Sequence, residues 1–157
     1  MESNEPPAFL WTSGKANRYN PAGIECIYFA EDLDLAILEY SRYMKLLGSE
    51  PMPFTTYFAD AKLPILDLAD AQILAALGLS DSDLHASWRL SSSLTKTQLL
   101  GLAVAQQRRF SAIRYPSDAA FAEGKTGFNY VIFRDCIDPA ALLRVLTGNL
   151  VAVQEWP

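Results

Sequence analysis

Residues 24–47 read IECIYFAEDLDLAILEYSRYMKLL and contain a strand that is followed directly by a helix. The first seven, Ile24–Ala30, are rich in the β-branched and aromatic residues that favour buried strands. Asp32 or Asp34 can cap the helix, in which apolar residues recur at helical spacing. Gly48, followed closely by two prolines, predicts the end of the helix.

The rest of the chain alternates elements of the same two kinds. Further strands are predicted at 54–63, 111–115, 130–134 and 150–156, an extended piece at 64–67, and helices at 69–77, 95–109 and 139–146. The polar segment 79–93 is predicted to be a surface loop. The pattern predicts one α+β domain, a mixed sheet with flanking helices, at residues 14–157. Residues 1–13 are expected to form a flexible tail.

Composition and charge exclude several classes of protein. The 157 residues are 50% hydrophobic and 20% charged, which suits a compact domain with a real core. The net charge of −5 argues against a protein that binds nucleic acid or an anionic membrane directly. No signal peptide and no membrane-spanning segment is apparent, so a cytoplasmic protein is expected. Cys26 and Cys136 lie in apolar runs, are expected to be buried free thiols, and show no metal-ligand spacing.

A few polar residues stand at unusual places in these elements. Arg18 lies in the loop that precedes the first strand, Tyr28 lies within that strand, and Glu39 falls near the apolar side of the following helix. A carboxylate is unexpected there unless it lines a cleft. Each also has an ordinary interpretation, as a solvated charge or, for Tyr28, a core residue. The single histidine, His85, is interpreted as a solvated surface residue.

Several short segments, taken in order, resemble one known family. They are NRYNPAG at 17–23, IYFA at 27–30, LAILE at 35–39, LPILDL at 63–68, TQLLG at 97–101, RYPS at 114–117 and FNYVI at 128–132. Together they resemble the RES domain, the toxin component of RES–Xre toxin–antitoxin pairs. The aromatic residue after the arginine is Tyr19, where tryptophan is commoner in the family.

The resemblance implies a fold similar to ADP-ribosyltransferases and a set of site residues. The arginine, glutamate and serine of the family name fall on Arg18, Glu39 and Ser117, and Tyr28 matches the active-site tyrosine. Glu39 would stabilise positive charge on a ribose, Arg18 would bind a pyrophosphate, and Tyr28 would offer a stacking face. Ser117 and Asn129 would contribute hydrogen bonds, although a helix cap and a turn former are the ordinary alternatives.

The activity that the resemblance implies is cleavage of the nicotinamide–ribose bond of NAD. The outcome would be NAD depletion, by phosphorolysis or hydrolysis, or transfer of ADP-ribose to a protein. NAD would be the substrate, inorganic phosphate a candidate co-substrate, and no metal would be needed. The implied partner is an Xre-type helix-turn-helix antitoxin. The alternative is a catalytically inactive RES-like module that binds a nucleotide or the antitoxin.

Overall fold

The computed structural model describes residues 11–12 and 14–156. The tail predicted at 1–13 therefore lies almost entirely outside the described residues. Of that segment, Trp11 is buried against Ile27 and Leu143, and the backbone of Thr12 donates to the carbonyl of Cys26.

The described residues contain strands and helices along the whole chain. The elements are β1 (Cys26–Ala30), α1 (Leu33–Leu46), β2 (Phe58–Lys62), β3 (Ile65–Asp67), α2 (Ala71–Ala76), α3 (Asp81–Leu84), α4 (Lys96–Gln107), β4 (Ala112–Pro116), α5 (Asp118–Ala122), β5 (Phe128–Phe133), η2 (Arg134–Cys136), β6 (Leu142–Leu146) and β7 (Ala152–Trp156). The strand–helix unit at 24–47 is confirmed as β1 and α1. Gly48 follows the helix with φ +67°, a conformation that glycine adopts at low cost.

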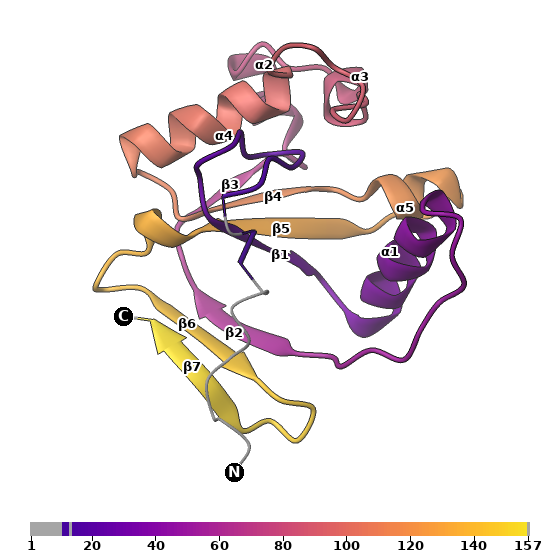
Figure 1. Ribbon diagram of the computed structural model, residues 1–157. Helices are drawn as coiled ribbons and strands as arrows, with labels where there is room; N and C mark the ends of the chain where they lie inside the picture. Colours follow the sequence, from indigo (N-terminus) through magenta and orange to yellow (C-terminus); the bar gives the residue numbers. More distant parts are fainter. Residues whose placement is uncertain (1–10, 13, 157) are drawn as a thin grey trace.

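The strands form two sheets that lie in separate layers. One has the order β1-β5-β4-β3, with β3 and β4 parallel and the other pairs antiparallel; the other is antiparallel, in the order β2-β6-β7. Helix α4 lies above the four-stranded sheet in Figure 1, and the three-stranded sheet lies below it. The predicted α+β class, with a mixed sheet and several helices, is confirmed.

Alternation along the four-stranded sheet divides its residues between two apolar clusters. The first cluster holds Cys26, Ile113 and Val131, together with Val104 of α4. The second cluster is formed by the intervening positions and includes Ile27, Ala112 and Ile132, with Leu143 of β6. Strands β1, β4 and β5 therefore bury both of their faces, because successive side chains point to opposite sides of a sheet. Both cysteines are free and buried, as predicted.

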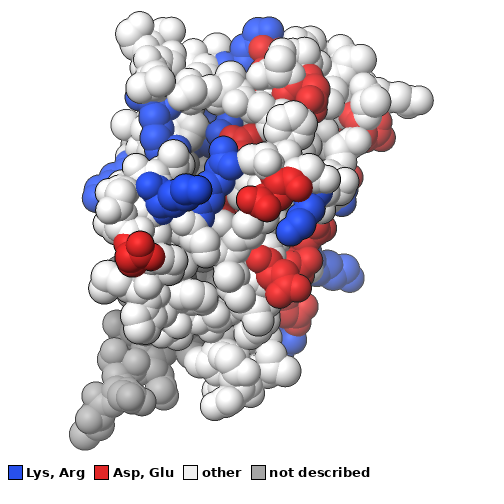
Figure 2. Space-filling view, turned by 90° about the vertical axis from the view of Figure 1, so that its right-hand side faces the viewer, with Lys and Arg blue, Asp and Glu red and all other residues white. Residues whose placement is uncertain are grey.

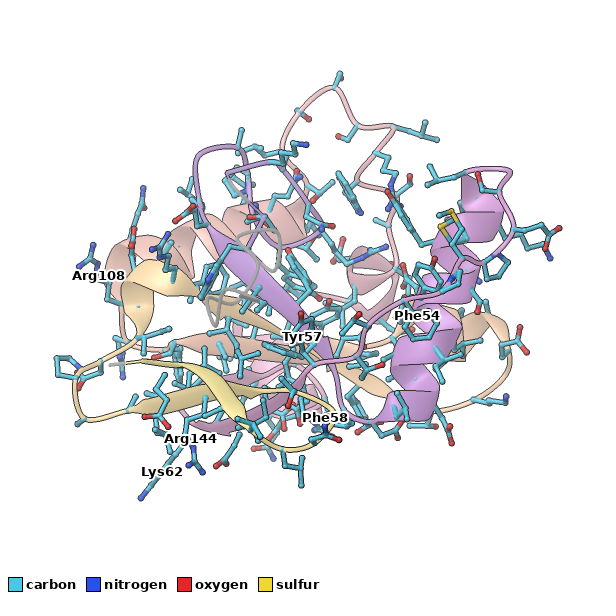
Figure 3. The ribbon with its side chains drawn as sticks, turned by 60° about the horizontal axis from the view of Figure 1, so that its bottom comes forward. Phe54, Tyr57, Phe58, Lys62, Arg108 and Arg144 are labelled. Carbon is cyan, nitrogen blue, oxygen red and sulfur yellow. The ribbon has the colours of Figure 1, made fainter. Side chains whose placement is uncertain are left out.

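The predicted helix at 139–146 is wrong, because this segment contains β6. Leu143 and Val145 are fully buried, while the alternate residues Leu142, Arg144 and Leu146 are partly exposed. That two-residue period belongs to a strand, and β6 pairs with both β2 and β7. In Figure 3, Arg144 lies near Lys62 on this small sheet, and its guanidinium pairs with Asp60 of β2.

Helix α3 occupies a segment that was predicted to be a loop, and α5 is a second short helix that was not predicted. Helix α3 lies within 79–93 and is stabilised by a capping box in which Ser80 and Asp83 bond each other's backbone N–H groups. Its last residue, Leu84, is buried in the first cluster. Helix α5 follows β4 directly, with Ser117 as its N-cap. No helix among the described residues is both long and apolar enough to cross a membrane.

Candidate active site

A cleft of about 770 Å³ lies where α1, the end of the four-stranded sheet and the segment after α3 meet. Its lining residues are Asn17, Arg18, Tyr28, Phe29, Ala30, Ala36, Glu39, Tyr40, Arg42, Tyr43, Leu46, Trp88, Arg89, Tyr115, Asp118 and Asn129. Seen from the side of α1 and α5, Lys and Arg side chains gather beside a group of carboxylates (Figure 2).

Glu39 enters this cleft from α1, and one of its two oxygens is held by two donors. The Ser117 hydroxyl donates to Oε1 at 2.7 Å, and the side-chain amide of Asn129 donates to the same oxygen at 2.5 Å. Among the described residues, Oε2 has no hydrogen-bond partner. The carboxylate is therefore oriented by Oε1 and presents Oε2 to a ligand.

Ser117 makes two hydrogen bonds through its hydroxyl group. Its hydroxyl donates to Glu39, and it also accepts the backbone N–H of Ala120 at 3.0 Å, which makes it the N-cap of α5. The residue is buried at the end of β4. The cap interpretation is therefore confirmed, and the same side chain also contacts the candidate catalytic carboxylate.

Replacing Ser117 by Ala is expected to affect both stability and turnover. Loss of an N-cap costs about 1 kcal/mol in the free energy of unfolding. Glu39 would then keep only the Asn129 donor, so we expect a smaller kcat with a nearly unchanged KM. Denaturant unfolding and steady-state kinetics measure the two effects. Thr95→Ala, which removes the N-cap of α4 outside the cleft, is the control. Unchanged kcat in the Ser117 variant would contradict an orienting role.

Arg18 lines the cleft, but much of its guanidinium is already engaged. Its Nη1 donates to the carbonyls of Leu84 at 2.8 Å and Ala86 at 2.9 Å, and its Nη2 pairs with Asp118. An arginine has five N–H hydrogens. Three are used in these bonds, so Nε and one hydrogen of Nη2 remain for a ligand. Arg18 therefore joins the loop before β1 to the end of α3 as well as facing the cleft.

The interpretation of His85 as a solvated surface residue is wrong. Its side chain is 15% exposed, its Nδ1 contacts the Asp118 carboxylate, and its ring stacks on Phe121 with centroids 4.4 Å apart. The imidazole is largely covered because it contacts Asp118 and Phe121 of α5. Asp118 thus receives both Arg18 and His85, which come from segments far apart in the chain.

Tyr28 fixes the loop that carries Arg18. Its hydroxyl donates to the side-chain oxygen of Asn20 at 2.8 Å and accepts the backbone N–H of Tyr19 at 3.1 Å. Burial raises the pKa of the Tyr28 phenol well above its usual range, so the group stays neutral at physiological pH. The hydroxyl is thus structural, while the ring lines the cleft.

The structure brings all five predicted site residues together. Arg18, Tyr28, Glu39 and Asn129 line the cleft, and Ser117 bonds Glu39. Sequence reasoning missed Asp118 and the cleft residues Arg42, Trp88 and Arg89. Asp118 directly follows Ser117 at the first turn of α5, and Arg42 follows Glu39 by three residues, so both had a spacing signal. Trp88 and Arg89 lie in an irregular segment that has none.

No group of three or more potential metal-ligating side chains occurs in the part of the chain that the structure describes. The cleft's donors and acceptors are those of arginine, tyrosine, carboxylate and amide groups. This set suits a polar organic ligand with anionic groups.

Comparison with known proteins gives one clear match. The family model described as "RES domain" matches residues 5–156, nearly the whole chain. No curated protein and no solved structure shows significant similarity, so the likeness to the ADP-ribosyltransferase fold stays a prediction. The RES family is generally associated with toxin–antitoxin systems. On the strength of the family match, this chain belongs to the RES domain family.

Proposed function

We propose that this protein is a RES-type toxin that cleaves the nicotinamide–ribose bond of NAD. The observation that carries the proposal is the Glu39 carboxylate, which stands in the cleft with Oε1 held by Ser117 and Asn129 and with Oε2 available. A fixed carboxylate is what a reaction with developing positive charge requires.

The reaction is a dissociative substitution at C1′ of the nicotinamide ribose. The C1′–N bond breaks, its electron pair stays on the nicotinamide nitrogen, and nicotinamide leaves as a neutral molecule. Positive charge then develops on C1′ and the ring oxygen, as in glycoside cleavage. Glu39 stabilises that charge more in the transition state than in the bound substrate. The acceptor oxygen of phosphate, water or a protein side chain forms the new bond to C1′, and a water or hydroxyl acceptor releases its proton to the solvent.

The other predicted residues hold the substrate for this step. The Tyr28 ring offers a flat face for the nicotinamide or its ribose, and the phenol stays protonated, so it is not the general base. Arg18 offers its two remaining N–H groups to the diphosphate. Neither role requires Ser117 as a nucleophile, which agrees with its engagement by Glu39 and Ala120.

One observation favours the alternative, an inactive module that binds a nucleotide or an antitoxin. Three of the five hydrogens of Arg18 are taken by Leu84, Ala86 and Asp118, which would suit a structural arginine. An inactive module would leave NAD intact, and its nucleotide-binding form would still bind ADP-ribose. Turnover therefore separates the two functions.

The test is incubation of the purified protein with NAD, with and without inorganic phosphate, followed by identification of the products. We expect release of nicotinamide. The partner product would be ADP-ribose 1″-phosphate for phosphorolysis, ADP-ribose for hydrolysis, or an ADP-ribosylated protein for transfer. Expression in bacteria is expected to lower NAD and slow growth, and an Xre-type partner is expected to relieve both effects. Intact NAD together with measurable ADP-ribose binding would favour the inactive module.

A further inference from the structure

Two arginines that the predicted site did not include face the same cleft from separate parts of the chain. Arg42 lies on α1, three residues after Glu39, and Arg89 lies in the segment after α3. Both are exposed, and neither has an acidic partner among the described residues. The Arg89 guanidinium rests over the ring of Trp88, 4.6 Å from its centroid, which restrains it at the cleft.

Arg42 and Arg89 give this cleft an excess of positive charge. Three arginines and two carboxylates line it, and Arg18 is paired with Asp118. The remaining charges in the cleft are then the positive charges of Arg42 and Arg89 and the negative charge of Glu39. The protein as a whole has a net charge of −5, so an anionic ligand needs a local positive potential to enter the cleft. This end of the cleft supplies that potential.

The position of Arg42 relative to Glu39 matches the shape of a dinucleotide. Residues three apart lie on one face of a helix, and three residues advance about 4.5 Å along its axis. In NAD the diphosphate is joined to the nicotinamide ribose through C5′, only a few bonds from the C1′ atom that Glu39 would face. A cation one turn beyond Glu39 is therefore placed to meet the diphosphate.

We propose that Arg42 and Arg89 together form the main binding site for the diphosphate of the substrate, with Trp88 positioning Arg89. This inference rests on the proposed function for the identity of the ligand. It also assigns different roles to the three arginines of the cleft. Arg18 chiefly holds the end of α3 and Asp118 in place, whereas Arg42 and Arg89 have most of their donors free to engage phosphate oxygens.

The test measures equilibrium binding of ADP-ribose and of nicotinamide riboside, which lacks phosphate, by calorimetry. Arg42→Gln and Arg89→Gln are each expected to weaken ADP-ribose binding about tenfold, since charge-assisted hydrogen bonds contribute at that level. Nicotinamide riboside binding should not change. Arg109→Gln removes the same charge at an exposed residue outside the cleft and should bind ADP-ribose like the parent. Arg42→Lys and Arg89→Lys should lose less affinity than the Gln variants, because lysine keeps the charge without the planar fork.

The outcomes separate this inference from the proposed function. Unchanged ADP-ribose affinity in both Gln variants overturns the diphosphate site, even if the protein cleaves NAD. Loss of affinity in those variants, with none in the Arg109 control, supports the site even if NAD is not cleaved. Failure of the parent protein to bind ADP-ribose overturns the inference. An equal loss for nicotinamide riboside also overturns it, because that ligand carries no diphosphate.

Discussion

Replacement of Glu39 by Gln is expected to lower NAD turnover by about a hundredfold or more while the fold and most nucleotide affinity are kept. The glutamine side-chain oxygen can still accept the hydrogen bonds from Ser117 and Asn129 that hold Oε1. The atom in place of Oε2 becomes an uncharged NH₂ group. Loss of one oriented electrostatic group commonly costs about 3 kcal/mol in the transition state.

The measurements are kcat for NAD cleavage, ADP-ribose affinity and thermal unfolding of the variant. A fall in kcat with little change in affinity shows that Glu39 acts in the transition state rather than in ground-state binding. Glu123→Gln is the matched control, since Glu123 is exposed and does not line the cleft. Parent-like turnover in the Glu39 variant would remove this residue from the mechanism.

Replacement of Gly101 by Ala is expected to destabilise the protein by about 3 kcal/mol or more, the upper range for overpacking. A Cβ atom at this position of α4 would lie 1.5 Å from the carbonyl oxygen of Tyr19 and 2.7 Å from its carbonyl carbon. Those atoms belong to backbone, so a side-chain rotation cannot relieve the clash. Helix α4 and the Arg18–Tyr19 loop would have to separate, although Gln98 bonds the carbonyl of Asn17 in that loop.

The sign of the change in the free energy of unfolding distinguishes the contact with Tyr19 from an effect of helix propensity. In an exposed helix, exchange of Gly for Ala stabilises by about 1 kcal/mol. A fall in the free energy of unfolding can therefore only reflect the close approach to Tyr19. Denaturant unfolding measures it, and ADP-ribose affinity should fall as well because the loop carries Arg18. Gly148→Ala, where a Cβ would meet no atom within 4 Å, is the control. A Gly101 variant as stable as the parent would contradict the packing described here.

Local patterns were sufficient for the elements whose signals lie within a few residues. The capping aspartate, the helical spacing and Gly48 were enough to predict α1, and its N-cap is Asp32, one of the two aspartates considered. Glu39 was conspicuous because a carboxylate stood near the apolar side of that helix. The ordered motifs were enough to identify the family, which the family model matches over 5–156.

Other features depended on partners far away in the sequence. The prediction of a helix at 139–146 was wrong because the segment pairs with β2, about 80 residues earlier, and nothing in the neighbouring sequence indicates that pairing. The low exposure of His85 has no signal in its neighbouring residues, because it depends on contacts with Asp118 and Phe121.

The sequence by itself determined the family, the α+β class and five residues of the candidate site, because each rests on short-range spacing or on motif order. Only the tertiary structure decided which contacts those residues make and therefore which role each can have. It joined Arg18 to Asp118, Oε1 of Glu39 to Ser117 and Asn129, and it placed Arg42 and Arg89 in one cleft. The physical reason is that hydrogen-bond partners and charge balance are set by distances in space, and these contacts join residues up to 100 positions apart in the chain.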